Sequence, residues 1–196
     1  VMTAISPLQS IHKKGIFGDH QKKKESDLLN ISEVKDLTII QIVQYKKSKI
    51  QLNSIQIDGL EFPLQNSKVL SNKETRILWS APSTWLVISR KENIDETIKE
   101  HCNSENFGIT NISHSRAVIQ IKGSQAREVL KKGSPINFNE FAANKCVGTV
   151  FHGITIVIDS ISDDPDTFNL LTLRSFGESF YHHITDAALE FGYVGV

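Results

Sequence analysis

Cysteine is scarce in this sequence: Cys102 and Cys146 are far apart and lie outside any C-x-x-C pattern. This argues against a disulfide framework and favours a reducing compartment, so we expect a cytoplasmic protein. Long hydrophobic runs are missing too. The longest, Leu37–Val43 and Ile154–Ile158, have the length of strands, which excludes a membrane-spanning helix.

The sequence also lacks the common motifs of nucleotide binding and hydrolysis. Neither G-x-G-x-x-G nor G-x-x-x-x-G-K-[ST] occurs, and there is no G-x-S-x-G. Ser113 and His114 are adjacent, but on a strand their side chains point to opposite faces, which disfavours a nucleophile–base pair. We therefore predict no catalytic residue and no cofactor-binding residue in this chain.

A charge excess of one sign is absent as well, because 22 Lys and Arg residues balance 22 Asp and Glu residues. The densest basic run, Lys22–Lys24, lies in a polar segment without interleaved aromatic residues, which is typical of a solvated arm. Nucleic-acid binders concentrate basic residues on the folded part of the chain, so we expect no nucleic-acid partner. The acidic excess at residues 151–196 suggests electrostatic steering onto a protein partner instead.

Histidine is the residue type that invites a metal hypothesis. His182 and His183 are adjacent on a predicted helix, so their side chains diverge by about 100°. One of them could join His152 from a neighbouring strand, but no third ligand is suitably spaced, and we predict no metal site. The acidic run Asp163–Asp166 contains a proline and reads as a turn between two strands.

The hydrophobic pattern predicts an α+β fold made of two ferredoxin-like (split βαβ) two-layer units. We expect an extended leader at residues 1–36, a first unit at 37–114 and a second at 115–196, the two units forming either separate or one continuous domain. The first unit combines β-branched strand patterns with a helix that Asn93 caps and whose inner face carries Ile94 and Ile98. Lys49–Ile57 fits either a strand or a short helix, and its spacing slightly favours the helix.

The second unit has the clearest periodicity of the chain. Arg116–Lys122 alternates apolar and polar residues, as a strand with one solvated face does. A helix is expected from Ser124, followed by strands at Val147–Phe151, Ile154–Ile158 and Phe168–Leu173. The last helix is expected from Ser175, and its apolar residues recur at spacings of three and four: Phe176, Phe180, Ile184, Ala187, Ala188 and Phe191.

Several segments, taken in order, resemble a known family. They are Ser6-Pro7-Leu8, Arg76–Trp79, Ala81–Val87, Thr110–Arg116, Lys122–Pro135, Arg174-Ser175-Phe176 and Leu189–Tyr193. Their order and spacing resemble the gamma subunit of heterotetrameric sarcosine oxidase over nearly the whole chain. Asn111 departs from this pattern, since the family often has Asp there.

The resemblance implies a non-catalytic docking subunit of a complex that oxidatively demethylates sarcosine to glycine. It implies alpha, beta and delta subunits as partners, and it places FAD, FMN, NAD and tetrahydrofolate on those partners. Six aromatic, histidine and arginine residues of the matching segments are candidate subunit contacts: Trp79, Trp85, His114, Arg116, Arg174 and Phe176. Core packing is the competing interpretation for both tryptophans and for Phe176.

The family is in turn similar to the folate-binding aminomethyltransferases of glycine cleavage. In those enzymes an acidic residue holds the pterin ring, whereas the corresponding segment here, Ser162–Leu170, has Asn169 at that position and Pro165 in the turn. An amide cannot supply the charge-assisted acceptor that a carboxylate offers. A stand-alone folate-binding or aminomethyltransferase-like protein is therefore the alternative function.

Overall fold

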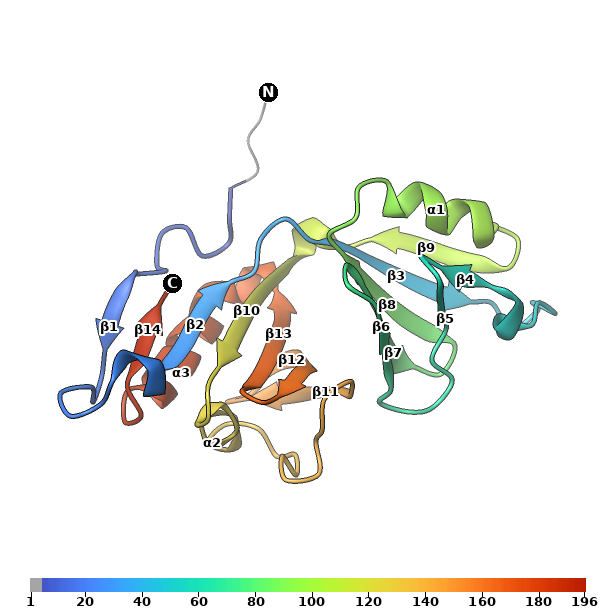
Figure 1. Cartoon of the computed structure of the whole chain (residues 1–196). Helices are drawn as coiled ribbons and strands as arrows, with labels where there is room; N and C mark the ends of the chain where they lie inside the picture. The colour runs from blue at the N-terminus through green and yellow to red at the C-terminus, as the bar shows by residue number, and fades with distance from the viewer. Residues whose placement is uncertain (1–4) are drawn as a thin grey trace. The chain divides into compact units, whose positions relative to one another are not determined.

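The computed structural model describes residues 5–196 and has the α+β architecture that the sequence predicts. Figure 1 shows the course of the chain, which divides into two compact units. The first unit contains the described residues up to Lys35, with His114–Ala143 and Gly148–Val196. The second unit contains Asp36–Ser113 and Asn144–Val147.

A seven-stranded sheet forms the first unit. Its strands are β1 (Gly15–Phe17), β2 (Leu29–Glu33), β10 (Arg116–Lys122), β11 (Cys146–Phe151), β12 (Ile154–Asp163), β13 (Asp166–Leu173) and β14 (Tyr193–Gly195). Their order across the sheet is β1-β14-β2-β10-β13-β12-β11. β10 is antiparallel to both of its neighbours, whereas β14 runs parallel to β2.

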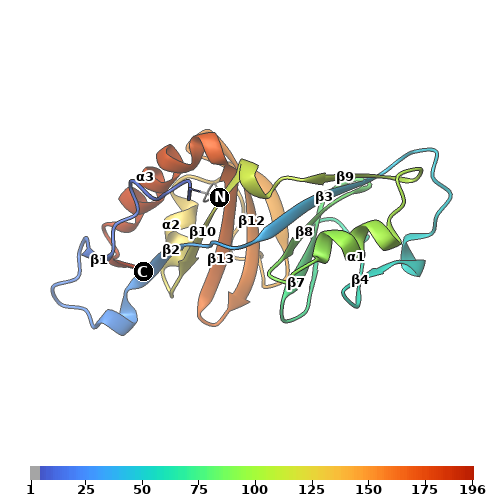
Figure 2. The same cartoon turned by 90° about the horizontal axis from the view of Figure 1, so that it is seen from above.

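Two helices, α2 (Ala126–Lys131) and α3 (Gly177–Ala188), are described in this unit, and both contact β-strands at its centre (Figure 2). The apolar stripe predicted for the last helix is confirmed for Phe180, Ile184, Ala187 and Ala188, which are buried, whereas Phe191 lies beyond the end of α3 and is half-buried. The beginning of this helix was predicted too early. Residues 174–176 form a tighter 3₁₀ turn, η4 (Arg174–Phe176), which leaves Phe176 exposed and outside the stripe.

Residues 5–35, expected as part of an extended leader, contribute β1, the 3₁₀ turn η1 (Glu25–Asp27) and β2 to this sheet. β2 lies between β14 and β10, and its alternate residues Leu29 and Ile31 are buried. Such a short alternation does not stand out in a polar sequence until its distant strand partners are known. Residues 1–4 of the expected leader lie outside the described residues.

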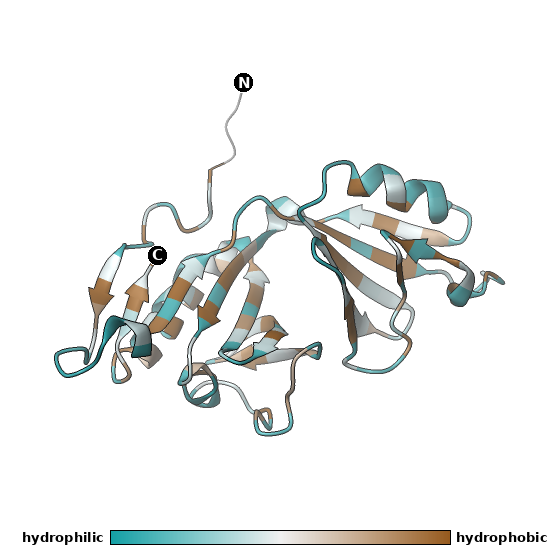
Figure 3. Ribbon diagram, in the orientation of Figure 1, coloured by the Kyte–Doolittle hydropathy of each residue, from teal (hydrophilic) through white to brown (hydrophobic). Residues whose placement is uncertain are grey.

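A five-stranded antiparallel sheet forms the second unit. Its strands are β3 (Thr38–Gln44), β6 (Val69–Ser71), β7 (Thr75–Ala81), β8 (Thr84–Ser89) and β9 (Phe107–Asn111). They lie in the order β6-β7-β8-β3-β9, and Figure 3 shows the hydrophobic residues along β3, β7 and β8. A separate ribbon is formed by β4 (Gln56–Ile57) and β5 (Leu60–Glu61). The core of this unit gathers the inner side chains Ile40, Ile42, Ile77, Trp85, Val87 and Phe107 with Phe62.

The helix predicted after Asn93 is confirmed as α1 (Ile94–His101), and Ile94 and Ile98 face the core. The predicted side-chain cap is wrong. Asn93 adopts a left-handed backbone (φ 60°) without a capping bond from its side chain, and its carbonyl accepts the amides of Glu96 and Thr97 at 3.1 and 3.2 Å. Asn reaches this backbone region more easily than most residues, which explains its presence.

The helix favoured for Lys49–Ile57 is also wrong. This segment contains the 3₁₀ turn η2 (Leu52–Ser54) followed by β4, and it buries Ile55 and Ile57. Within the described residues of the second unit, α1 is then the single α-helix, and the finer expectation of two ferredoxin-like units is not confirmed. Among residues 5–196 no helix has the length and apolar character needed to cross a membrane.

Candidate functional site

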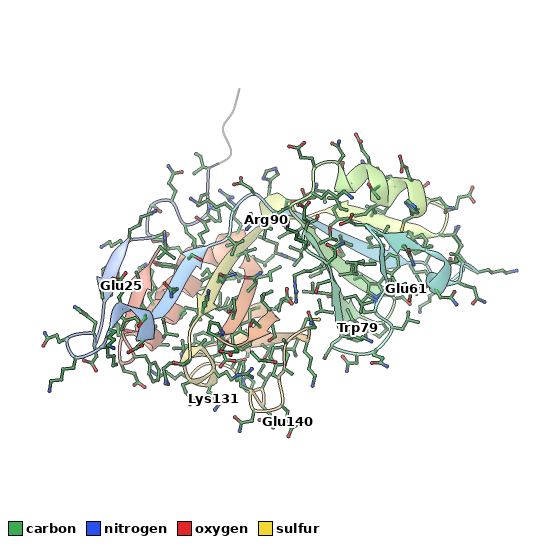
Figure 4. All side chains as sticks on the ribbon, in the orientation of Figure 1. Glu25, Glu61, Trp79, Arg90, Lys131 and Glu140 are labelled. Carbon is green, nitrogen blue, oxygen red and sulfur yellow. The ribbon has the colours of Figure 1, made fainter. Side chains whose placement is uncertain are left out.

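The two tryptophans proposed as subunit contacts belong to the second unit and differ in accessibility. Trp85 on β8 is 2% exposed, lies 4.8 Å from the ring of Phe62, and donates its indole N–H to the carbonyl of Pro63 at 2.8 Å. It is therefore a core residue with no surface to offer. Trp79, labelled in Figure 4, is half-buried on β7. Its carbonyl accepts the Cys146 thiol at 3.1 Å.

The other four candidates gather at one end of the sheet in the first unit. Arg116 begins β10 and is the register partner of Leu173, the last residue of β13. Arg174 and Phe176 follow in η4, and His114 comes two residues before Arg116 in the 3₁₀ turn η3 (Ser113–Ser115). We call this group, with Leu173 and Ile5, the η4 patch.

The apolar residues of the η4 patch are unusually accessible. Ile5 is 67% exposed, Phe176 is 47% exposed and Leu173 is 42% exposed. The guanidinium of Arg174 donates to the carbonyl of Ile5, which ties the incoming chain to η4. Exposed apolar side chains on neighbouring segments, together with two arginines, make this end of the sheet a candidate protein-binding surface.

The segment that carries Ile5 is positioned by buried contacts. Leu8 is fully buried, and the Ser6 hydroxyl donates to the carboxylate of Glu33 on β2. Gly177, at the start of α3, allows this close packing, because a Cβ there would lie 3.1 Å from the Cβ of Ala117 and 3.5 Å from Leu8. The segment that carries Ile5 is therefore held in place by packing against the sheet and against α3.

The charge of the η4 patch is positive. Burial lowers the pKa of Arg116 below its ordinary value, yet an arginine remains protonated at neutral pH. Arg174 adds a second cation, and His114 is exposed at the edge. This surface suits a partner that presents carboxylates around an apolar centre.

Two side chains that could act as nucleophiles, Ser113 and Cys102, are occupied or inaccessible. The Ser113 hydroxyl accepts the amide of Ile39 at 2.9 Å and donates to the Asn111 side chain at 2.7 Å. Cys102 is buried, and burial raises the pKa of its thiol to about 11, which keeps it protonated at neutral pH. These groups serve packing and local hydrogen bonding.

A hollow of about 420 Å³ lies beside Arg127 of α2. Its guanidinium binds Asp166 at 2.7 Å, Asp163 at 2.8 Å and the carbonyls of Phe138 and Phe141. The Asp163–Asp166 turn predicted between two strands is confirmed, and two of its carboxylates are committed to Arg127. This cluster fastens the loop after α2 to the β12–β13 hairpin. Its charged groups bind one another, so they are not available to hold a ligand.

Asn169, which the sequence resemblance matched to the pterin-binding carboxylate of the aminomethyltransferases, is also occupied. The amide oxygen of Asn169 accepts the side chain of Gln120 at 2.9 Å across the β10–β13 pair. Among residues 5–196 no group of three or more His, Cys, Asp or Glu side chains is placed to hold a metal ion. The structure does bring His152 close to His183 rather than His182, with ring centres 5.2 Å apart.

Sequence reasoning missed Ile5 and Leu173 as members of the η4 patch and Arg127 as the centre of its cluster. Leu173 could have been found, since it is an outward apolar residue at the end of a predicted strand. Two aspartates in one turn also signal a nearby cation. Ile5 carried no signal, because its neighbourhood depends on contacts across the length of the chain.

Comparison with known proteins gives a consistent family. Residues 49–190 match the model of the "Sarcosine oxidase, gamma subunit family". The chain is 27% identical over 121 residues to sarcosine oxidase subunit gamma of Corynebacterium sp. (strain U-96), covering 60% of this chain. That alignment spans 58% of the relative, so less than two thirds of its length is represented.

Solved structures show the same fold. A chain of the heterotetrameric sarcosine oxidase from Corynebacterium sp. U-96, in complex with pyrrole 2-carboxylate, superposes with a TM-score of 0.79 at 21% identity, covering 95% of both chains. The aminomethyltransferase T of the glycine cleavage system from Bartonella henselae has a TM-score of 0.62 at 12% identity, over 87% of this chain and 49% of that one. The expected likeness to the aminomethyltransferase fold is confirmed. Because the family model covers more than half of the sequence, the chain belongs to the sarcosine oxidase, gamma subunit family.

Proposed function

We propose that this chain is a non-catalytic docking subunit of a sarcosine oxidase assembly, which oxidatively demethylates sarcosine to glycine. The observation that carries the proposal is the family match over residues 49–190. The related chain of known structure comes from an assembly described as heterotetrameric, which supports a function exercised together with other subunits.

The η4 patch is the proposed contact surface for those subunits. Docking would remove its exposed apolar residues from water, which would stabilise the complex by roughly 25 cal/mol for each Å² of apolar surface buried. Arg116 and Arg174 would orient the partner and raise the association rate, because charge complementarity acts mainly on the rate of encounter and on specificity. Trp79 remains a second candidate contact on the other unit, whereas the burial of Trp85 removes it from consideration.

The partners in this proposal are alpha, beta and delta subunits, and FAD, FMN, NAD and tetrahydrofolate would be bound by them. The occupied side chains of Ser113, Asn169 and Arg127 support a chain that contributes shape rather than reacting groups. The two free, buried cysteines support a cytoplasmic location.

The alternative, a stand-alone folate-binding or aminomethyltransferase-like protein, has the fold likeness in its favour. It is disfavoured by Asn169, whose amide oxygen already accepts Gln120. Titration of the isolated chain with tetrahydrofolate separates the two functions: we expect no heat of binding, and micromolar affinity would favour the alternative.

Co-purification tests the docking proposal directly. The tagged chain is co-expressed with the flavin-bearing subunits of its own assembly, and the flavin absorbance that it retains is measured. The isolated chain is expected to be colourless and to release no sarcosine-dependent peroxide. In the Phe176→Glu variant we expect at least tenfold less co-purified flavin, since the new carboxylate would be desolvated against the apolar centre of the contact and would repel the carboxylates of the partner.

Leu64→Glu is the matched control, because Leu64 is equally apolar, 63% exposed and located in the second unit. It should retain the flavin-bearing subunits at the original level. Thermal melting must first show that both variants fold. Full retention by folded Phe176→Glu would contradict the assignment of the η4 patch, and failure of the original chain to retain any flavin would contradict the subunit role itself.

A further inference from the structure

A pair of histidines in the first unit has a geometry that neither packing nor the proposed function uses. His152 lies in the turn between β11 and β12, and His183 lies on α3. Both residues are exposed, and their ring centres are 5.2 Å apart with an interplanar angle of 39°. In the part of the chain that the structure describes, neither ring hydrogen-bonds to another group.

The ring of His152 is positioned by its surroundings. Its ring centre lies 4.8 Å from that of Phe151, in an edge-to-face arrangement, and its backbone amide donates to the carbonyl of Gly133 at 3.0 Å. Gly133 leaves room for the imidazole, because a Cβ there would come within 2.9 Å of the His152 Cδ2 atom. A ring held on two sides loses little freedom when it binds a ligand.

The turn itself does not require a histidine. His152 has a positive φ of 46° and precedes Gly153 at φ 83°, which is the backbone of a two-residue hairpin turn. Asn or Asp followed by Gly is the preferred pair for such a turn. The imidazole is therefore an addition to the turn rather than a consequence of it.

The separation of the rings agrees with joint coordination of one ion. An imidazole nitrogen lies about 1.1 Å from its ring centre and a Zn–N bond is about 2.0–2.1 Å long, so zinc would lie about 3.2 Å from each centre. At a tetrahedral angle the two centres are then about 5 Å apart. The ring-centre distance of 5.2 Å agrees with this value.

The charges around the pair also suit a cation. Asp186 follows His183 by three residues on α3, about one helical turn. The neighbouring cation, Lys132 of α2, donates to the carbonyl of Ala187 and pairs with Glu190 at 3.1 Å, so its charge is compensated.

We propose that His152 and His183 form a two-imidazole site for a divalent transition metal, specifically Zn²⁺. Within the described residues no third protein ligand joins them. Water completes the tetrahedron in the isolated chain, which makes this an open and exchangeable site. The proposal is independent of the docking function, since it concerns two residues outside the η4 patch.

Isothermal titration of the full chain with zinc chloride tests the site. We expect one zinc ion per chain and an affinity that falls at least about tenfold in His152→Asn and in His183→Gln, since each loses one of the two nitrogen ligands. Asn retains the positive-φ turn, and Gln retains the helix. Unchanged melting temperatures show that both variants remain folded.

His182→Gln is the matched control, because His182 is the neighbouring exposed histidine on the same helix. It should bind zinc within about twofold of the original chain. The proposal is overturned if the original chain shows no saturable one-to-one binding, if either site variant binds as tightly as the original, or if His182→Gln weakens binding as much as the site variants do.

Discussion

Replacing the carboxylate of Asp58 by an amide is a small chemical change that should clearly lower the unfolding free energy of the second unit. It occupies the β4–β5 turn with a positive φ of 53°, and its side chain is only 14% exposed. The ammonium of Lys91 binds its carboxylate, Thr75 donates to it at 2.7 Å, and Asn72 donates at 3.0 Å. This network fastens the turn to the ends of β7 and β8.

The Lys91 hydrogen bond, helped by Asn72 and Thr75 and opposed by burial, lowers the pKa of Asp58 from 3.8 to about 2. A shift of this size corresponds to about 2 kcal/mol of unfolding free energy. Because the pKa of the folded state is depressed, the stabilisation is complete above about pH 4 and disappears as the pH falls through 2.

Asp58→Asn removes the charge and keeps a residue that accepts the positive φ. We expect it to lower the unfolding free energy by about 2 kcal/mol at pH 7, with a difference that shrinks towards zero between pH 4 and pH 2. Urea unfolding across this range, followed by circular dichroism, measures both quantities.

Asp95→Asn provides the control, because Asp95 forms an exposed ion pair with Lys99 one helical turn away at 3.5 Å. Such a surface pair contributes no more than about 0.5 kcal/mol. The reasoning would be refuted if Asp58→Asn cost less than Asp95→Asn at pH 7, or if its cost did not change with acid.

Three further outcomes follow from contacts in the structure. Arg127→Ala should lower the unfolding free energy by about 3 kcal/mol in urea titration, because it leaves the half-buried Asp166 without its cation; a loss below that of Asp95→Asn would contradict this. Gly18→Ala should destabilise more than Gly59→Ala in thermal melting, since both have φ +76° but only at Gly18 would the Cβ meet a carbonyl, at 2.2 Å; equal losses would contradict the steric argument. Cys102 should react with a thiol reagent only as fast as the chain unfolds, because burial raises its pKa to about 11, and rapid labelling of the folded chain would be the opposite result.

The parts of the fold that the sequence predicted are those where periodicity is long and local. The alternation in Arg116–Lys122 and the stripe of the last helix both correspond to real elements. Lys49–Ile57 was misread, because Ile50, Ser54 and Ile57 have helical spacing while the chain buries Ile55 and Ile57 from a 3₁₀ turn and a two-residue strand. β1 and β14 have three residues each, and only pairing with segments far away in the sequence makes them strands: β1 pairs with β14, and β14 pairs with both β1 and β2.

In the candidate site, too, some features follow from the local sequence and others depend on the folded structure. Residues of a matching motif, such as Arg116, Arg174 and Phe176, could be named from the sequence, but their exposure could not. Phe176 looked like the first residue of a buried stripe, and Trp85 looked as available as Trp79. The 3₁₀ turn η4 places Phe176 outside the buried stripe. Trp85 is held in the core, where its indole N–H donates to the carbonyl of Pro63.

The strand order β1-β14-β2 has a consequence for how the polypeptide is made. Residues 193–195 insert between two strands that were synthesised roughly 160 to 180 residues earlier, and β14 pairs with both. While the ribosome is still translating, β1 and one edge of β2 therefore wait without a neighbour, exposed to any other nascent strand. Completion of this sheet therefore waits for residues 193–195, and a chaperone or an assembling subunit has the whole interval before their synthesis in which to act.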